Sequence, residues 1–487
     1  MIKQWKFPGG IALGGHKQTT EIRDTALPAE LNYPLLQRSD CYATATVYPG
    51  ERVLKGQVIA TQKNPLTTPV HAASSGVIKE IAPHLIAHPS GLTDSCIVIE
   101  TDGLDEALPA NPCLDYHLET AENLRIKIAQ AGIVGLGGAA FPTAEKLQAL
   151  QPIHTLIING AECEPYISCD ASLIGSHAQQ VVQGALIMQY ILQAERCIIA
   201  IENNMPATLQ ALHEATSQES IQIVSVPAIY PTGGEKQLIK VLTGKKIPAN
   251  ALPTDHGVVC QNVGTAFAVY QAIIQGIPLT ERIITITGKG INHPGNLRVK
   301  IGTPIKYLIE QCGGYSQNIQ RLIMGGPMMG IALSSDDIAV IKATNCLLGM
   351  TNNELAESQS AMPCIRCGDC STVCPAELLP QQLYWYGRSG QLEQCQDYQL
   401  FDCIECGCCD IVCPSHIPLV QSFRSSKGEL IIKEKQAAQA QLAKKRYQNQ
   451  QQRREKEQQD KIAKAAKRQA AIDKIKAAAA KRKTKGV

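Results

Sequence analysis

Cys364-Ile-Arg-Cys367-Gly-Asp-Cys370-Ser-Thr-Val-Cys374-Pro375 is the first of two cysteine runs near the C-terminal end of the chain. The second run reads Cys403-Ile-Glu-Cys406-Gly-Cys408-Cys409-Asp-Ile-Val-Cys413-Pro414. Both contain the spacing C-x2-C-x2-C-x3-C-P, which brings three thiolates of one loop together, while the proline turns the chain away from a continuing helix. The repeated spacing predicts two metal-binding loops in one small domain.

This spacing is typical of cubane iron–sulfur clusters in bacterial ferredoxins, where the fourth Cys of each run binds the other cluster. The sequence therefore predicts two [4Fe–4S] clusters. One would be held by Cys364, Cys367, Cys370 and Cys413, and the other by Cys403, Cys406, Cys409 and Cys374. Structural zinc sites are the alternative, but they require neither the third Cys nor the trailing Cys-Pro. Cys408 falls outside the spacing, so it is not expected to be a ligand.

The bulk properties of the chain limit its class. Its 487 residues are enough for three or more domains rather than one core. No run of about 18 uninterrupted apolar residues occurs, so no transmembrane helix is expected. The first residues lack an apolar stretch, so no secretory signal is expected. Thiolate ligands favour a reducing cytoplasmic location and argue against disulfides.

Charge is distributed unevenly along the chain. The segment Lys427–Val487 holds 19 of the 46 basic residues but only 6 of the 43 acidic ones. Its Ala-, Lys-, Gln- and Arg-rich composition predicts a long solvated helix or a disordered arm. Such an arm suits an anionic membrane surface or an acidic partner, or it simply keeps the protein in solution.

Three patterns precede the cysteine runs. Val53–Ala60 and Val70–Ile78 read as short strands and turns, in a rhythm that resembles the barrel-sandwich hybrid of lipoyl and biotinyl carrier domains. Apolar runs such as Thr155–Asn159 and Cys197–Ile201 then alternate with helical segments, which predicts an open doubly wound α/β sheet. The segment Thr285–Gly314 predicts a small β-grasp domain.

A glycine-rich stretch between Gly132 and Lys146 is the second chemical signal. Gly135-x-Gly137-x-x-Ala140 matches a relaxed dinucleotide fingerprint, but the segment before it is helix-like, and no P-loop Gly-Lys-Ser/Thr follows. Glycines let backbone N–H groups approach an anion, and Lys146 in the next helix adds a positive charge. A tight structural loop without a ligand is the alternative on this feature alone.

Four segments together resemble the NADH- and flavin-binding subunit of respiratory complex I. They are Gly135–Lys146, Asn159-Gly-Ala161-Glu162-Cys163-Glu164-Pro165, Tyr230-Pro-Thr-Gly233-Gly234-Glu235-Lys236 and Asn262-Val-Gly-Thr265. With the strand-rich start and the ferredoxin-like end, the domain order resembles the RnfC subunit of the Rnf (Rsx) ion-translocating electron-transport complex. Ala161 and Gly234 stand where the complex I family has Asp and Glu. The resemblance therefore implies FMN more directly than it implies a mode of NADH binding.

The resemblance also implies site residues and domain limits. The residues implied for FMN are Gly135, Gly137, Gly138, Lys146, Asn159, Glu162, Tyr230, Gly233 and Thr265, and those for the nucleotide are Glu164 and Glu235. The predicted fold is multidomain, α/β and α+β. Its parts are an N-terminal segment with a barrel-sandwich hybrid (1–115), an open doubly wound FMN/NADH-binding α/β domain (116–280), a β-grasp, SLBB-like domain (281–350), a helical two-cluster ferredoxin-like domain (355–425) and a basic tail (427–487).

These features predict an electron-input subunit of a membrane-bound, ion-translocating NADH:ferredoxin-type oxidoreductase. NADH would be the substrate, FMN and two [4Fe–4S] clusters the cofactors, and the other subunits and a ferredoxin-like carrier the partners. The chain would be a peripheral protein on the cytoplasmic side of the inner membrane, and no nucleic-acid partner is expected. A soluble flavin iron–sulfur reductase and a non-enzymatic iron–sulfur wiring subunit without flavin are the alternatives.

Overall fold

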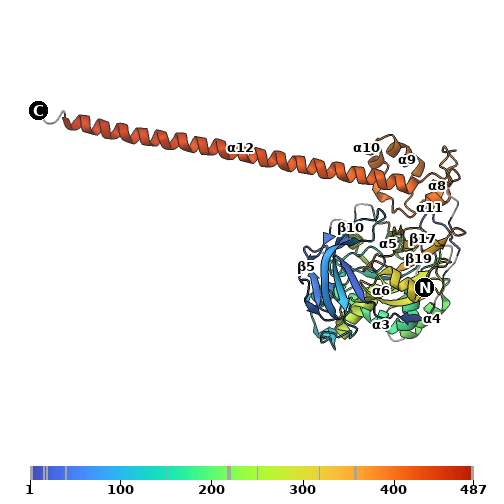
Figure 1. Ribbon diagram of the computed structural model, residues 1–487. Coiled ribbons are helices and arrows are strands. Elements are labelled where there is room, and N and C mark those ends of the chain that lie inside the picture. The colour runs from blue at the N-terminus through green and yellow to red at the C-terminus, as the bar shows by residue number, and fades with distance from the viewer. Residues whose placement is uncertain are drawn as a thin grey trace.

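The computed structural model describes residues 4–14, 17, 20–38, 41–149, 151–216, 221–248, 251–316, 319–355 and 359–483, with side chains as far as residue 479. A body of packed sheets and helices forms one end of the molecule, and one long helix extends away from it (Figure 1).

Short antiparallel strands form the N-terminal region, as the strand-and-turn rhythm predicts. One sheet has the order β2-β10-β9-β6, a second has β5-β7-β8, and β3 pairs with β4. Their bounds are β2 (Glu30–Pro34), β3 (Leu36–Arg38), β4 (Cys41–Tyr42), β5 (Thr44–Ala45), β6 (Arg52–Val53), β7 (Val58–Thr61), β8 (Val70–His71), β9 (Gly76–Leu85) and β10 (Thr93–Thr101). Buried residues of this region and of the following α/β region form one continuous apolar cluster.

A parallel sheet of order β13-β12-β11-β14 forms the α/β region. The strands are β11 (Thr155–Gly160), β12 (Arg196–Glu202), β13 (Gln222–Val226) and β14 (Val258–Asn262). The helices are α1 (Ala121–Gln130), α2 (Thr143–Lys146), α3 (Cys169–Leu192), α4 (Pro206–Ala215), α5 (Glu235–Thr243) and α6 (Val263–Tyr270), with shorter turns η1 (Tyr116–Leu118), η2 (Pro253–His256) and η3 (Gln271–Gln275). Helices α3, α4 and α6 pack on one face and α5 on the other, which confirms the predicted doubly wound sheet.

A six-stranded sheet of order β1-β16-β15-β19-β17-β18 forms the β-grasp region. Its elements are β1 (Ile22–Asp24), β15 (Glu281–Thr287), β16 (Gly295–Lys300), α7 (Ile305–Gln311), β17 (Ile319–Met324), β18 (Ile331–Ala332) and β19 (Cys346–Thr351). Strand β1 comes from the N-terminal segment and pairs in parallel with β16. Three residues are too few to show an alternating pattern; the strand forms because the edge of β16 offers it backbone partners.

Helices surround both cysteine runs. They are α8 (Asp369–Thr372), α9 (Pro380–Arg388), α10 (Leu392–Asp397), η4 (Leu400–Asp402), α11 (Cys408–Ile411) and α12 (Leu419–Lys483). The two runs have the same backbone geometry at an offset of 39 residues, because Arg366 and Glu405, like Gly368 and Gly407, all have positive φ. A short helix follows each glycine.

Helix α12 begins inside this C-terminal region and continues as the basic tail (Figure 1). It buries Phe423 and Leu430, and from residue 431 to 479 its side chains are exposed. The expected boundary between residues 425 and 427 therefore falls within one helix. Among the described helices, none combines the length and apolar character needed to cross a membrane.

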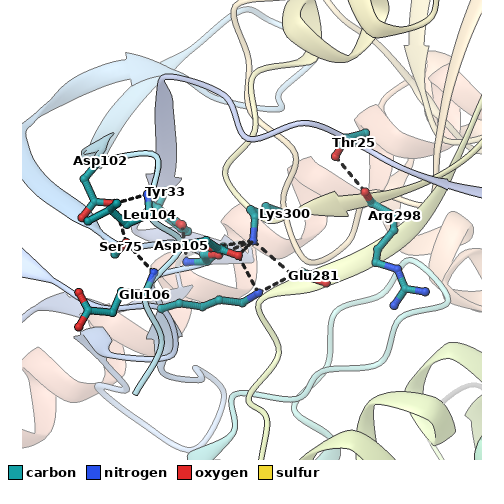
Figure 2. A network of polar contacts seen from close by, with 12 residues as sticks. Thr25, Tyr33, Ser75, Asp102, Leu104, Asp105, Glu106, Glu281, Arg298 and Lys300 are labelled. Atoms are coloured by element: carbon teal, nitrogen blue, oxygen red, sulfur yellow. Dashed lines mark hydrogen bonds and ion pairs between the residues drawn. The ribbon is translucent and has the colours of Figure 1, made fainter. Parts of the chain in front are cut away.

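A charged network joins the N-terminal region to the β-grasp region (Figure 2). Lys300 Nζ lies 3.0 Å from Asp105 Oδ2 and donates to the carbonyl of Ala73 at 3.2 Å. Lys55 Nζ lies 2.9 Å from Glu281 Oε1 and 3.3 Å from Asp105 Oδ2. Each of these partly exposed ion pairs contributes little to the free energy of unfolding. The main effect of the network is therefore to fix how the two regions dock.

Candidate functional site

Several residues implied for flavin, among them Gly137, Asn159 and Gly233, lie at the carboxyl end of the parallel sheet, where its strand order reverses. Asn159 lies near the end of β11, and Asn262 ends β14, on the opposite side from β12. A Cβ atom on Gly137 would lie 3.4 Å from the Cβ of Asn262, so the glycine-rich loop closes over this edge. Ligands of open α/β sheets bind in the crevice at this reversal.

In the glycine-rich loop, the N–H groups of buried residues form hydrogen bonds, whereas those of the exposed residues in the described part of the chain do not. Leu136 is buried and donates its N–H to Thr265 Oγ1 at 2.9 Å, and buried Ala140 donates to the Gly135 carbonyl at 3.2 Å. In the part of the chain that the structure describes, the N–H groups of exposed Gly137–Ala139 have no hydrogen-bond partner. Three consecutive free donors are suited to bind an anionic group.

Lys146 and Glu235 form an ion pair beside this loop. Lys146 Nζ lies 2.7 Å from Glu235 Oε1, and the two side chains are 25% and 39% exposed. Lys146 ends α2, and Glu235 begins α5. Because a half-exposed pair is weak, an anionic ligand can take over Lys146 at little cost. The structure thus brings together the residue predicted for the phosphate and one predicted for the nucleotide.

Asn159 and Gly233 fasten the end of β11 to the segment after Tyr230. Asn159 Nδ2 donates to the Gly233 carbonyl at 2.9 Å, and its Oδ1 accepts from the N–H of Ala161 at 3.0 Å. A Cβ on Gly233 would lie too close to the carbonyl oxygen of Ala161, at 2.3 Å, so this approach requires glycine.

Glu162 caps a helix. Its carboxylate accepts the N–H groups of Asp170 at 2.9 Å and Ala171 at 3.1 Å, at the start of α3, and the residue is 8% exposed. Ligand atoms of Glu162, Cys169 and Asp170 lie within 4.8 Å of one another. Burial first, and the Glu162 charge second, raise the pKa of Asp170 to about 7. Sequence reasoning missed Asp170, since nothing in its local pattern distinguishes it from a surface carboxylate.

Glu164 binds the β-grasp region. Its two oxygens accept the N–H groups of Met328 at 3.1 Å and Met329 at 2.9 Å, in the loop between β17 and β18. Burial raises the pKa of Glu164 to about 6. Its predicted contact with the nucleotide stays a prediction.

Tyr230 connects the crevice region to the cysteine runs. It is 2% exposed, and its hydroxyl donates to the carbonyl of Cys406 at 2.8 Å. Its backbone pairs with Ile11, and the neighbouring Gly10 donates its N–H to the carbonyl of Val373 at 2.9 Å. The loop of the second run and the end of the first therefore both rest against the body of the protein.

The thiols lie in two groups. Burial raises the pKa of Cys403 to about 11, and the nearby thiols of Cys406 and Cys374 add to this. Burial likewise raises the pKa of Cys409, with contributions from Cys403, Cys406 and Cys374. The pKa of Cys370 is raised by burial, by Cys367 and by Cys413. Cys374 of the first run is thus near thiols of the second run, and Cys413 of the second run is near Cys370 of the first. Crossed ligation would use the same pairs of runs.

The spacing of the thiols also bears on the zinc alternative. Among the described residues, the only three or more His, Cys, Asp and Glu ligand atoms within 4.8 Å of one another are those of Glu162, Cys169 and Asp170. None of the eight cysteines belongs to such a set. Four thiols around one zinc ion lie closer together than four around a cubane, so a zinc site would require these cysteines to move toward one another.

A large cavity lies elsewhere. It has a volume of about 650 Å³ and is bounded by residues of three regions, among them Lys55, His177, Tyr270 and Arg298. None of the predicted site residues lines it. A much smaller cavity of about 40 Å³ adjoins the glycine-rich loop at Leu136. Asp170 and Arg282 also line it.

Family models match three parts of the chain. The RnfC barrel sandwich hybrid domain matches residues 5–104, the Nuo51 FMN-binding domain residues 128–271 and the SLBB domain residues 283–332. A solved structure of an NAD+-reducing [NiFe]-hydrogenase in the H2-reduced state covers 65% of this chain and 62% of its own, at 16% identity and a TM-score of 0.44, which is too low to support an argument.

Curated relatives match nearly the whole chain. Proteins named as the C subunit of the ion-translocating oxidoreductase complex are 45% identical over 472 residues in Erwinia tasmaniensis, 47% over 449 in Yersinia enterocolitica and 46% over 451 in Yersinia pestis. These alignments cover 96%, 91% and 92% of this chain, but 58%, 64% and 73% of the relatives. With this identity and coverage, and with the three family domains in order, the chain belongs to the RnfC family, the C subunits of ion-translocating oxidoreductase complexes.

Proposed function

We propose that the chain is the electron-input subunit of an ion-translocating oxidoreductase complex, exchanging electrons between NADH, FMN and two [4Fe–4S] clusters. The names of its relatives and the match to an FMN-binding domain support the electron-transport role. We place the subunit at the periphery of the cytoplasmic face of the inner membrane, among further subunits of the complex and a ferredoxin-like carrier.

The glycine-rich loop and the neighbouring end of the sheet offer groups that suit a flavin mononucleotide. The free N–H groups of Gly137–Ala139 and the half-exposed ammonium of Lys146 suit its phosphate. Asn159, Thr265 and the backbone of Gly233 would hold in place the segments around the flavin. Glu235 would help orient the nicotinamide nucleotide. When bound, FMN accepts a hydride from NADH and passes the two electrons on singly, as iron–sulfur clusters require.

The contact between Tyr230 and Cys406 carries the proposal. It gives the crevice region a direct hydrogen-bonded link to one predicted cluster, the one assigned to Cys403, Cys406, Cys409 and Cys374. The other predicted cluster would lie at a more open surface, since Cys367 is exposed and Ile365 is 68% exposed. Electrons would pass from the crevice to the first cluster, then to the second, and there to a partner.

The proposal is tested on anaerobically purified protein. Addition of NADH should bleach both the flavin and the cluster absorbance. Lys146→Ala should purify with its clusters but bind FMN at least about tenfold more weakly, because a charge-assisted contact contributes about 1.5–3 kcal/mol. Glu235→Ala should keep its flavin and be reduced slowly by NADH, while dithionite still reduces the clusters.

Lys246→Ala is the matched control. Lys246 forms a similar exposed pair with Glu377 at 2.6 Å, away from the loop, so its loss should change neither property. Wild-type protein that holds FMN but ignores NADH would contradict the proposed reaction with NADH, and wild-type protein that binds no FMN would favour an iron–sulfur wiring subunit.

A further inference from the structure

We propose that two cations of the β-grasp region, Lys342 and Arg282, are positioning residues for the glycine-rich loop. They bind the carbonyls of its buried part, so that the N–H groups of Gly137–Ala139 stay free for an anionic group. The identity of that group as the FMN phosphate rests on the proposed function. The positioning itself rests on the following contacts.

Lys342 holds the entrance to the loop. It lies before β19, and its ammonium donates to the carbonyl of Gly132 at 2.7 Å, the carbonyl of Pro69 at 2.7 Å and Thr68 Oγ1 at 3.0 Å. Among the described residues, no carboxylate lies within ion-pair distance of it. Burial lowers its pKa to about 7. All three acceptors of Lys342 are neutral oxygens, and one of them is the Gly132 carbonyl, so its side chain ties the start of the loop to the N-terminal region.

Arg282 holds the centre of the loop. It lies on β15, is 7% exposed and donates from Nη2 to the carbonyl of Leu136 at 3.1 Å. Its Nη1 donates to the carbonyl of Lys342, which joins the two cations into one unit. Thr265 Oγ1 accepts the N–H of Leu136. The N–H and the carbonyl of Leu136 are therefore both held by side chains, one from Thr265 and one from Arg282.

Gly132 gives independent evidence that the loop lies very close to Pro69 and Lys342. It has a φ of +68°, and a Cβ there would lie 2.6 Å from the carbonyl oxygen of Pro69 and 2.9 Å from Nζ of Lys342. A side chain would therefore displace the acceptor and the cation together. Glycine is needed both for the backbone conformation and for the contact with Lys342.

The consequence is a preorganised anion site. The carbonyls of Gly132 and Leu136 are held within the protein, while the three residues after Leu136 are exposed with unpaired donors in the described part of the chain. Donors fixed before binding cost less ordering entropy on association. The β-grasp region thereby shapes a site whose direct ligands lie in a different domain.

The experiment uses the full chain with clusters loaded and flavin removed. Lys342→Met and Arg282→Gln are compared with Lys300→Met, a control that also removes a cation bridging the N-terminal and β-grasp regions but touches no part of the loop. FMN binding is measured by quenching of flavin fluorescence, and hydrogen exchange is measured for peptides covering residues 133–142. Iron content reports folding of the C-terminal domain.

Lys342→Met and Arg282→Gln should weaken FMN binding about tenfold or more and speed exchange in the loop, with iron content unchanged. Arg282→Lys should recover part of both. Lys300→Met should alter neither. Equal effects in Lys300→Met, or loop exchange unchanged in Lys342→Met, would overturn the proposal. If the wild-type chain binds no FMN, the proposed function fails, and the exchange measurements still decide whether these cations order the loop.

Discussion

Tyr230 donates its hydroxyl hydrogen to the main-chain carbonyl of Cys406 across 2.8 Å, and both residues are buried. The two lie 176 residues apart in the sequence. One belongs to the segment implied for flavin and the other to a predicted cluster loop. This hydrogen bond therefore joins the predicted flavin-binding region, which would receive electrons, to the predicted cluster domain, which would carry them away.

Removing that hydroxyl should slow transfer without emptying the site. Tyr230→Phe keeps the ring and its packing but leaves the Cys406 carbonyl unpaired, at a cost of about 1 kcal/mol of stability. Stopped-flow spectra after mixing with NADH should show normal flavin reduction and slower cluster reduction. Tyr307→Phe, which loses a hydroxyl bonded to the carbonyl of Leu27 at 3.3 Å in the β-grasp region, should behave as wild type. Identical kinetics in the two variants would mean that the contact between Tyr230 and Cys406 is only structural.

Crossed ligation makes a specific prediction about iron. Wild-type protein should hold about 8 iron per chain, as expected for two cubanes. Cys374→Ser should damage the cluster of Cys403, Cys406 and Cys409, and about half of the iron should be lost. The spectroscopic signature of the remaining cluster identifies which one survives. Damage to the cluster of Cys364, Cys367 and Cys370 instead would contradict the crossed assignment.

Cys408 provides the control for that experiment. It is fully buried beside Cys406, and a hydrogen bond from Cys408 lowers the pKa of Cys406. Cys408→Ala should therefore keep all the iron while shifting the reduction potential of the adjacent cluster, because hydrogen bonds to ligand sulfur tune that potential. Loss of a cluster in this variant would make Cys408 a ligand.

Glu164 should make stability depend on pH. Its pKa is about 6 in the folded protein against a reference value of 4.5, so the folded state holds the proton more tightly than the unfolded state. Stability linked to this proton is complete below about pH 4.5 and is lost as the pH rises through about 6. The loss amounts to roughly 2 kcal/mol, since one pKa unit is worth about 1.4 kcal/mol.

Glu164→Gln should remove this dependence, and the difference in unfolding free energy between the two proteins, measured across this range, isolates it. Glu354→Gln is a suitable comparison, because Glu354 also accepts backbone N–H groups, from Thr351 and Lys289. A constant difference between wild type and Glu164→Gln at all pH values would refute the shift.

Truncation of the basic tail should spare the cofactors if the cut is placed correctly. Lys427 donates to the carbonyl of Cys403 at 2.7 Å, and Leu430 is buried, so a cut at Lys427 would damage the C-terminal domain. A chain ending at Lys433 should keep its iron and bind anionic vesicles less tightly at low salt. Each basic residue near such a surface contributes about 1 kcal/mol. Unchanged vesicle binding would identify the tail as a solubilising arm.

Local spacing made much of this molecule predictable from sequence. The cysteine runs, the parallel strands around Asn159 and the turn-rich N-terminal strands all have patterns contained in a few consecutive residues. Strand β1 could not be anticipated in this way, because its strand partner among the described residues is the edge of a strand more than 270 residues later.

The same limit applies to the site. Lys146 and Glu235 were each implied as ligands, but their ion pair joins residues 89 positions apart. Lys342 and Arg282 gave no signal at all, because a lysine held by neutral carbonyls looks like any surface lysine in sequence. The partners of buried polar groups are determined by tertiary packing, which a linear pattern does not contain.

Helix α12 has an electrostatic consequence. From Leu430 to Lys483 a continuous helix extends roughly 80 Å at about 1.5 Å per residue. The Debye length in physiological salt is about 8 Å, so charges along most of this rod do not feel the acidic body at its base. The body and the far end of α12 therefore act as two electrostatically independent regions. An anionic surface can attract the basic end of α12 without competition from the carboxylates of the body.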